Sequence, residues 1–68
     1  MYDMTMFQAD ITVDYADGSR GGKVIYATSR EQVMDDAFYF VSQQVVEGRE
    51  TGNEVVEHKV KSKVSKNV

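Results

Sequence analysis

Residues 5–15 read TMFQADITVDY, and apolar and polar side chains alternate along this stretch. The odd positions from Phe7 to Tyr15 are apolar or aromatic, while the even positions between them are polar or acidic. A period of two places successive side chains on opposite faces of an extended chain. The pattern therefore predicts a strand with one buried face and one face in water.

A turn and a return strand follow directly. Residues 16–22 read ADGSRGG, and the pair Asp17-Gly18 strongly favours a tight hairpin. Residues 23–28, KVIYAT, are then expected to return antiparallel to the first strand. The glycine-rich loop lacks the strand-to-helix context and the Lys-Ser/Thr pair of a phosphate-binding loop, so we interpret it as a hairpin.

A helix is predicted over residues 30–47. Its start can be capped by Thr28 with Glu31 or by Ser29 with Gln32, and the sequence leaves both registers open. Gly48 is the expected C-terminal cap. The apolar residues at helical spacing, expected to form the buried stripe, are Val33, Met34, Ala37, Phe38, Val41 and Val45.

Residues 54–65 alternate again and predict a third strand. One face is expected to hold Val56, His58, Val60, Ser62 and Val64, and the other Val55, Glu57, Lys59, Lys61 and Lys63. The helix returns the chain, so this strand can lie antiparallel beside the first strand (order 2-1-3) or parallel beside the second (order 1-2-3). We expect a single α+β domain over residues 1–68, with ββαβ topology, strand order 2-1-3 and one helix on one face, because antiparallel sheets tolerate a wet face.

Composition narrows the function classes. The 68 residues include no cysteine, which excludes disulfides and thiolate metal sites. The N-terminus has no basic segment followed by an apolar run, and no stretch approaches a membrane span, so we expect a cytoplasmic protein with no membrane contact. Residues 1–56 carry ten acidic and four basic side chains (−6) and residues 57–68 one acidic and four basic (+3), which together give the net charge of −3.

Nothing in the sequence indicates an enzyme or a cofactor. His58 is the only histidine, and no nucleophile is placed beside it by a motif. Asp35 and Asp36 diverge by about 100° on a helix, and Asp10 and Asp14 lie about 13 Å apart on a strand, so neither pair converges on a metal ion. We predict no catalytic residues, no metal and no cofactor.

The exposed residues favour a protein partner. One helix covers one face of the sheet, which leaves Met4, Met6 and Val55 on the other face, and Tyr39 and Val46 fall off the buried stripe. The residues expected to contact a partner are Asp10, Asp14, Glu31, Asp35, Asp36, Tyr39 and Val46. In size, charge and plan the chain resembles small acidic accessory proteins of bacteriophages and mobile elements. That resemblance implies an inhibitor or modulator of a host nucleic-acid-processing or defence complex, acting in the cytoplasm of a bacterial host cell.

Two alternatives stay open. The lysines of the C-terminal strand are candidates for phosphate contacts to a nucleic acid, namely Lys59, Lys61, Lys63 and Lys66. Cross-strand pairing of Lys59–Lys63 with Asp10 and Asp14 would explain the same row without a ligand. A homodimer or larger homo-oligomer is the second alternative, because small domains often gain stability by self-association.

Overall fold

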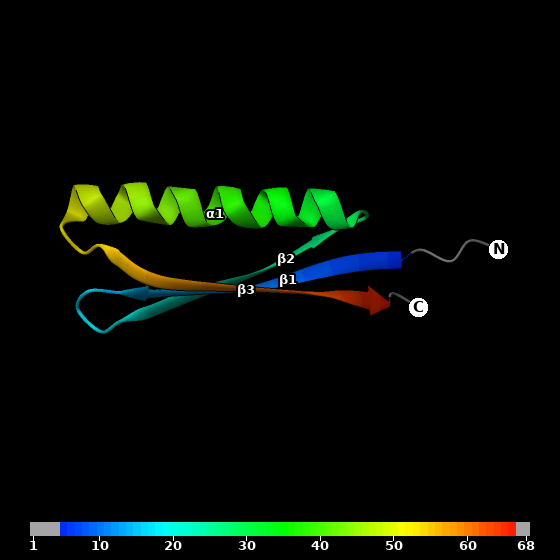
Figure 1. Cartoon of the computed structure of the whole chain (residues 1–68), viewed down its shortest axis with the longest axis horizontal. Coiled ribbons are helices and arrows are strands. Elements are labelled where there is room, and N and C mark those ends of the chain that lie inside the picture. Colours follow the sequence, from blue (N-terminus) through cyan, green and yellow to red (C-terminus); the bar gives the residue numbers. More distant parts are fainter. Residues whose placement is uncertain (1–4, 67–68) are drawn as a thin grey trace.

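The structure is a computed structural model and describes residues 5–66. Its elements are β1 (Thr5–Tyr15), β2 (Arg20–Ala27), α1 (Arg30–Thr51) and β3 (Val55–Lys66). The strands form one sheet in the order β2-β1-β3, and both pairings are antiparallel (Figure 1). The predicted α+β class, the ββαβ topology and the central place of the first strand are confirmed.

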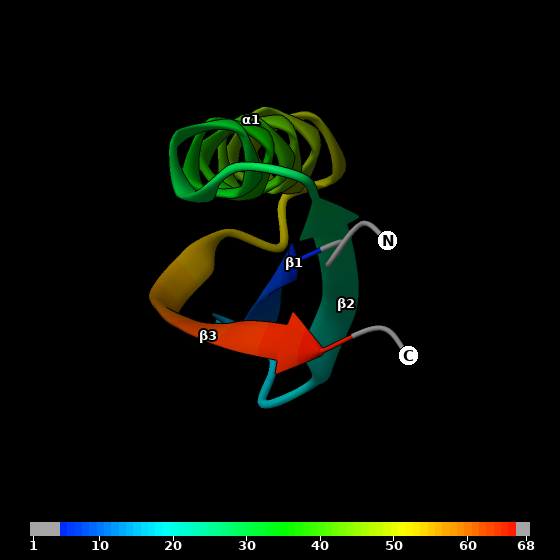
Figure 2. The ribbon, with the colours of Figure 1, turned by 90° about the vertical axis from the view of Figure 1, so that its right-hand side faces the viewer.

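The core lies between β1 and α1. The fully or nearly fully buried side chains are Ala9, Ile11 and Val13 of β1 and Val33, Ala37 and Val41 of α1. Figure 2 shows α1 over one face of the sheet, with no element on the other face among the described residues. Burying a valine or isoleucine side chain contributes about 1.5–3 kcal/mol, so this single interface dominates the stability.

The hairpin forms where Asp17-Gly18 predicts it. The N–H of Gly18 donates to the carbonyl of Tyr15 over 3.0 Å, and Gly18 has a φ of 88°, which glycine adopts without strain. The carboxylate of Asp17 accepts from the backbone N–H of Ser19 at 2.8 Å. Hydrogen bonds from the side chain and the backbone of Ser19 lower the pKa of Asp17 from its ordinary value.

The helix begins at the second of the two candidate caps. Ser29 is the N-cap, and its hydroxyl accepts from the N–H of Gln32 at 3.1 Å. In a full capping box the side chain of Gln32 would accept from the backbone N–H of Ser29. Here it donates to Asp36 at 2.9 Å instead.

The predicted helix end at Gly48 is wrong. The helix continues to Thr51, and Gly52 caps it with a φ of 78° in the left-handed region. Gly48 lies buried inside the helix, where a Cβ atom would meet the carbonyl oxygen of Asn53 at 2.6 Å. Gly48 is therefore needed for the close approach of the loop after the helix and not for a turn.

The predicted buried stripe is correct except at Phe38, which is 55% exposed. Phe40 packs against the core instead, and the ammonium of Lys23 lies 5.4 Å from its ring centroid. The buried stripe centres on Val33, Ala37 and Val41, and Phe38 lies about 100° around the helix from Ala37. The helix is therefore oriented with Phe40 toward the core, and the side chain of Phe38 is exposed to water.

An irregularity in β3 reverses the predicted faces at its start. Asp14 pairs with Glu57 but Tyr15 pairs with Val55, so the register shifts by one residue and leaves Val56 without a partner on β1. Val55 consequently packs against the core, while Val56 is 66% exposed. The prediction that Val55 lies on the open face is wrong, because a β-bulge of this kind inserts an extra residue.

Candidate functional site

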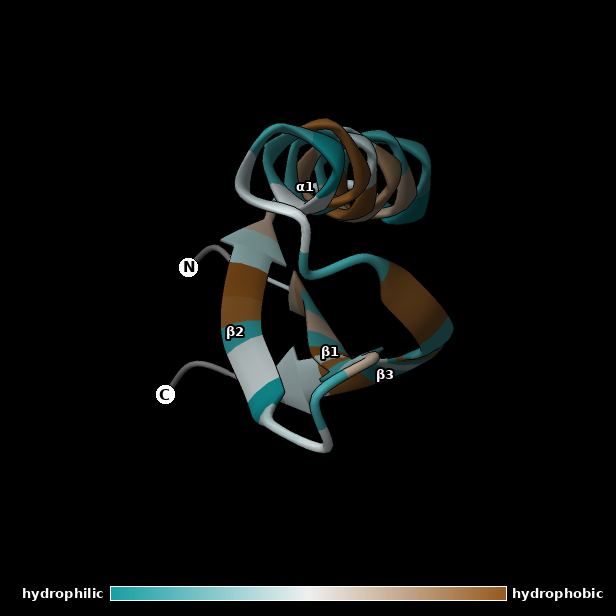
Figure 3. Cartoon of the chain, turned by 90° about the vertical axis from the view of Figure 1, so that its left-hand side faces the viewer, coloured by the Kyte–Doolittle hydropathy of each residue, from teal (hydrophilic) through white to brown (hydrophobic). Residues whose placement is uncertain are grey.

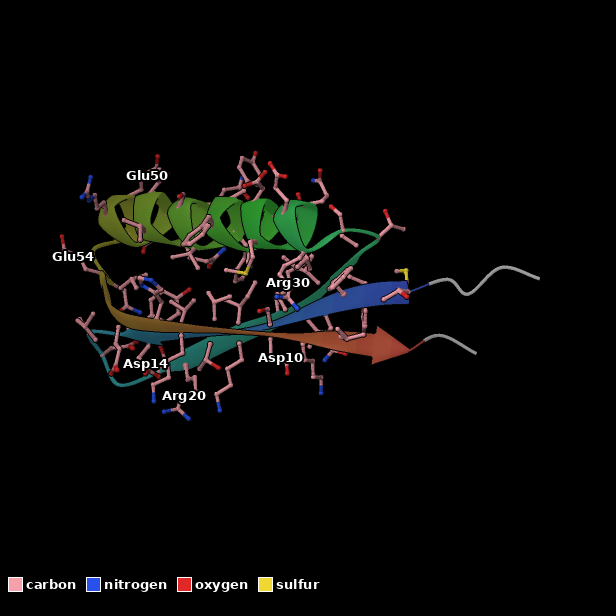
Figure 4. The ribbon with its side chains drawn as sticks, turned by 45° about the vertical axis from the view of Figure 1, so that its right-hand side comes forward. Asp10, Asp14, Arg20, Arg30, Glu50 and Glu54 are labelled. Carbon is pink, nitrogen blue, oxygen red and sulfur yellow. The ribbon has the colours of Figure 1, made fainter. Side chains whose placement is uncertain are left out.

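The acidic residues predicted to contact a partner do not form one surface. Asp10 and Asp14 project from the face of β1 that points away from α1 (Figure 4), whereas the other predicted contacts are all on α1. Those helical residues are Glu31, Asp35, Asp36, Tyr39 and Val46. The sheet and its core separate the two groups, so each face is a separate candidate surface.

The first candidate is the side of α1 that points away from the sheet. Tyr39 is 66% exposed and Val46 is 54% exposed, as expected for residues off the buried stripe. They are seven residues apart, so they lie two turns apart on the same side of the helix. Both line a shallow depression with Ser42, Gln43, Glu47 and Glu50, and Gln43 donates to the Tyr39 hydroxyl at 2.9 Å.

Carboxylates surround these two apolar side chains. The helix carries five acidic residues and two arginines. Asp35 lies one turn before Tyr39 and Glu50 one turn after Val46, so both flank the apolar pair on the same side. Glu50 points outward from the helix in Figure 4. We call Asp35, Tyr39, Val46, Glu47 and Glu50 the outer helix face.

The second candidate is the open sheet face, which is polar in its centre. Asp14 forms an ion pair with Arg20 over 2.7 Å, which raises the pKa of Arg20. Asp10 accepts from the side chain of Gln8 at 2.7 Å. By the β1–β3 register Asp10 lies opposite Lys61, whereas Asp14 lies opposite Glu57.

The expected cross-strand Asp–Lys pairs do not form. Among the described side chains, the Arg20–Asp14 pair is the only ion pair within 4.0 Å. Lys59, Lys61 and Lys63 are exposed, and none of them forms an ion pair with a described side chain. Lys66 ends β3, but its side chain lies outside the described residues, as does Met4.

The sequence interpretation missed several exposed apolar residues. Val24 and Tyr26 are 48% and 55% exposed, and their register with Asp10 and Gln8 places them on the open sheet face. The alternation of side chains within residues 23–28 could have predicted that Val24 and Tyr26 share this face. Val64 is 46% exposed, and its register with Phe7 places it on the helix side of β3. Figure 3 shows hydrophobic bands on β2 and at the start of β3.

The metal-ligating residue types do not cluster on either face of the described part of the chain. Within residues 5–66, no group of three or more acidic residues and histidine could hold a metal ion. His58 lies opposite Val13 and is exposed. The outer helix face and the open sheet face are both candidate binding surfaces.

Comparison with protein-family models, with curated proteins and with solved structures finds no match to this chain. The one helix within the described residues is not apolar enough to cross a membrane.

Proposed function

We propose that this chain is a non-enzymatic protein-binding module that docks its outer helix face into a basic groove of a partner protein. The observation that carries this proposal is the pair Tyr39 and Val46, exposed two turns apart and flanked by carboxylates. Helices that bind in grooves present anchors at this spacing.

The two apolar side chains supply the affinity. Tyrosine is among the residues that most often dominate interface energies, and a fully buried valine contributes about 1.5–3 kcal/mol. The opposite side of the same helix is fixed in the core by Val33, Ala37 and Val41. The anchors therefore stand on a rigid element, and little ordering entropy opposes binding.

The charge of the helix supplies the selectivity. Five carboxylates against two arginines favour a basic partner surface and speed its encounter with the helix. A second copy docked helix to helix would place carboxylates of the two outer helix faces close to one another. This repulsion argues for a different protein as the partner.

Basic grooves in proteins commonly hold nucleic acid, since phosphate binding requires clustered lysine and arginine. An acidic helix with apolar anchors that occupies such a groove would exclude the nucleic acid. We therefore propose an inhibitor or modulator of a bacterial nucleic-acid-processing or defence complex, acting in the cytoplasm.

Site-specific photo-crosslinking tests this proposal. A photoreactive phenylalanine analogue replaces Tyr39 in one sample and Tyr26, which is 55% exposed on the open sheet face of β2, in a matched control. In bacterial lysate we expect the Tyr39 position to crosslink to one protein, and double-stranded DNA to suppress that crosslink. The double variant Tyr39→Ala with Val46→Ala should lose the partner while keeping its thermal midpoint, because both side chains are largely exposed.

Two results would contradict the proposal. Crosslinks to the same protein from the Tyr26 position with equal yield would show that the outer helix face is not the contact. Retention of the partner by the folded double variant would show that the two apolar anchors are not used.

A further inference from the structure

The outer edge of β3 is a long, unpaired strand edge. β3 is 12 residues long and pairs with β1 along one side, and no described strand lies on its other side. Half of the backbone N–H and C=O groups of such a strand point outward and can bind a further strand. β2, the other edge strand, has 8 residues and includes Gly21 and Gly22, so it is the weaker template.

Apolar side chains accompany this edge on the helix side. Val60 is partly buried and Val64 is 46% exposed, both on the face of β3 that α1 covers. Phe40 lies on the β2 side of the helix, because Lys23 of β2 contacts its ring. Phe38 lies about 160° around the helix from Phe40, which places it on the β3 side. Phe38, Val60 and Val64 thus flank the edge with apolar surface.

Lysines accompany the same edge on the open side. Lys59, Lys61 and Lys63 alternate along β3, so their Cα atoms are spaced by about 7 Å, and all three are exposed. None forms an ion pair with a described side chain. A strand added at this edge would therefore meet positive charge on one face and apolar groups on the other.

These charges oppose a second copy of the chain as the added strand. In an antiparallel pair about a two-fold axis perpendicular to the sheet, opposite residues share the same face. Lysines of one β3 would then oppose lysines of the other over most of the row, and like charges in direct opposition destabilise a sheet. Lysines at an edge are a known device against such self-pairing.

We propose that the outer edge of β3 accepts an extended acidic segment of another protein as a fourth strand. Alternate residues of that segment are aspartate or glutamate and face Lys59, Lys61 and Lys63. The residues between them are apolar and contact Phe38, Val60 and Val64. This site is separate from the outer helix face and does not depend on its function.

A synthetic peptide of nine alternating glutamate and valine residues, blocked at both ends, is the probe. Titration into the full-length chain, followed by amide NMR, should shift the β3 amides most strongly. Lys61→Glu should weaken binding roughly tenfold, because one opposite-charge pair becomes a like-charge pair. Lys23→Glu, which makes the same charge change on β2, should alter affinity by less than about twofold. The added strand would lie three strand spacings, about 14 Å, from β2, whereas the Debye length at physiological ionic strength is about 8 Å.

Three further peptides distinguish strand addition from charge attraction. A peptide with lysine in place of glutamate should bind Lys61→Glu more tightly than the natural chain. N-methylation of the glutamate amides in one peptide and of the valine amides in another should abolish binding in one case only, because alternate amides point to opposite edges of a strand.

Each of four results would overturn the proposal. Equal binding by both N-methylated peptides would exclude backbone pairing. Equal weakening by Lys23→Glu and Lys61→Glu would show unspecific attraction. Sedimentation of the free chain as a dimer with protected β3 amides would assign the edge to a second copy. Tighter binding of a single-stranded oligonucleotide to the lysines than of the acidic peptide would make the row a nucleic-acid contact.

Discussion

Replacement of Gly48 by alanine tests the packing of the loop that joins α1 to β3. In an exposed helix interior this change stabilises a protein, because alanine is favoured over glycine by about 0.8–1.0 kcal/mol. At Gly48, however, the new Cβ would lie 2.6 Å from the carbonyl oxygen of Asn53 and 3.3 Å from the Cα of Glu54. Both contacts are with backbone atoms, which cannot rotate away as a side chain would.

The clash outweighs the helix propensity. Inserting one methyl group into a packed site costs about 1–3 kcal/mol, and a backbone contact of this kind belongs at the upper end. After subtraction of the propensity gain, Gly48→Ala should lower the free energy of unfolding by about 1–2 kcal/mol. For a domain of this size the thermal midpoint should fall by roughly 4–15 °C.

Thermal and urea unfolding followed by circular dichroism measure this effect. Ser42→Ala, on the exposed side of the same helix, is the matched control and should raise stability by a few tenths of a kcal/mol. Gly52→Ala meets no atom within 4 Å but has a φ of 78°, so it should cost about 1 kcal/mol through backbone strain alone. A Gly48→Ala variant as stable as the natural chain, or more stable, would refute the argument from close approach.

Three further predictions test other parts of the fold. Ser29→Ala removes the acceptor for the N–H of Gln32 and should cost about 1 kcal/mol in urea unfolding, and an unchanged midpoint would show that the cap contributes nothing. Val33→Ala empties part of a fully buried site and should cost about 2 kcal/mol, whereas Val46→Ala at the surface should cost under about 0.5 kcal/mol. The folded-state pKa of Asp17 is lowered, so its contribution is present above about pH 4 and is lost as the pH falls through the folded pKa. The stability difference between the natural chain and Asp17→Ala should therefore shrink in acid, and a difference independent of pH would count against this assignment.

The local elements of this protein were predictable because their signals are local. Alternation along residues 5–15 depends only on which side chains an extended chain turns to one face, and it predicted the central strand. Asp17-Gly18 supplies the turn by its own backbone preferences, and Ser29 supplies a cap within one turn of the helix. Chain direction then favoured the order 2-1-3, since antiparallel pairing tolerates an open face.

The candidate sites were less predictable, because they depend on contacts between distant residues. The acidic residues looked like one set in the sequence, but the sheet separates Asp10 and Asp14 from the acidic residues of α1. The expected partner of Asp14 was a lysine of β3, whereas the register places Glu57 opposite it and the hairpin brings Arg20 to it.

Periodicity and capping were enough to predict the elements, their order and the main buried stripes, because both act over a few neighbouring residues. The end of the helix, the aromatic residue that enters the core and the face on which Val55 lies depend instead on tertiary contacts. Gly48 allows the close approach of Asn53 to the helix, and the orientation of α1 turns Phe40, not Phe38, toward the core. A bulge opposite Asp14 and Tyr15 places Val55 on the helix side of β3. Each of these outcomes depends on how two separate elements fit together, and the spacing of residues within one element does not contain that information.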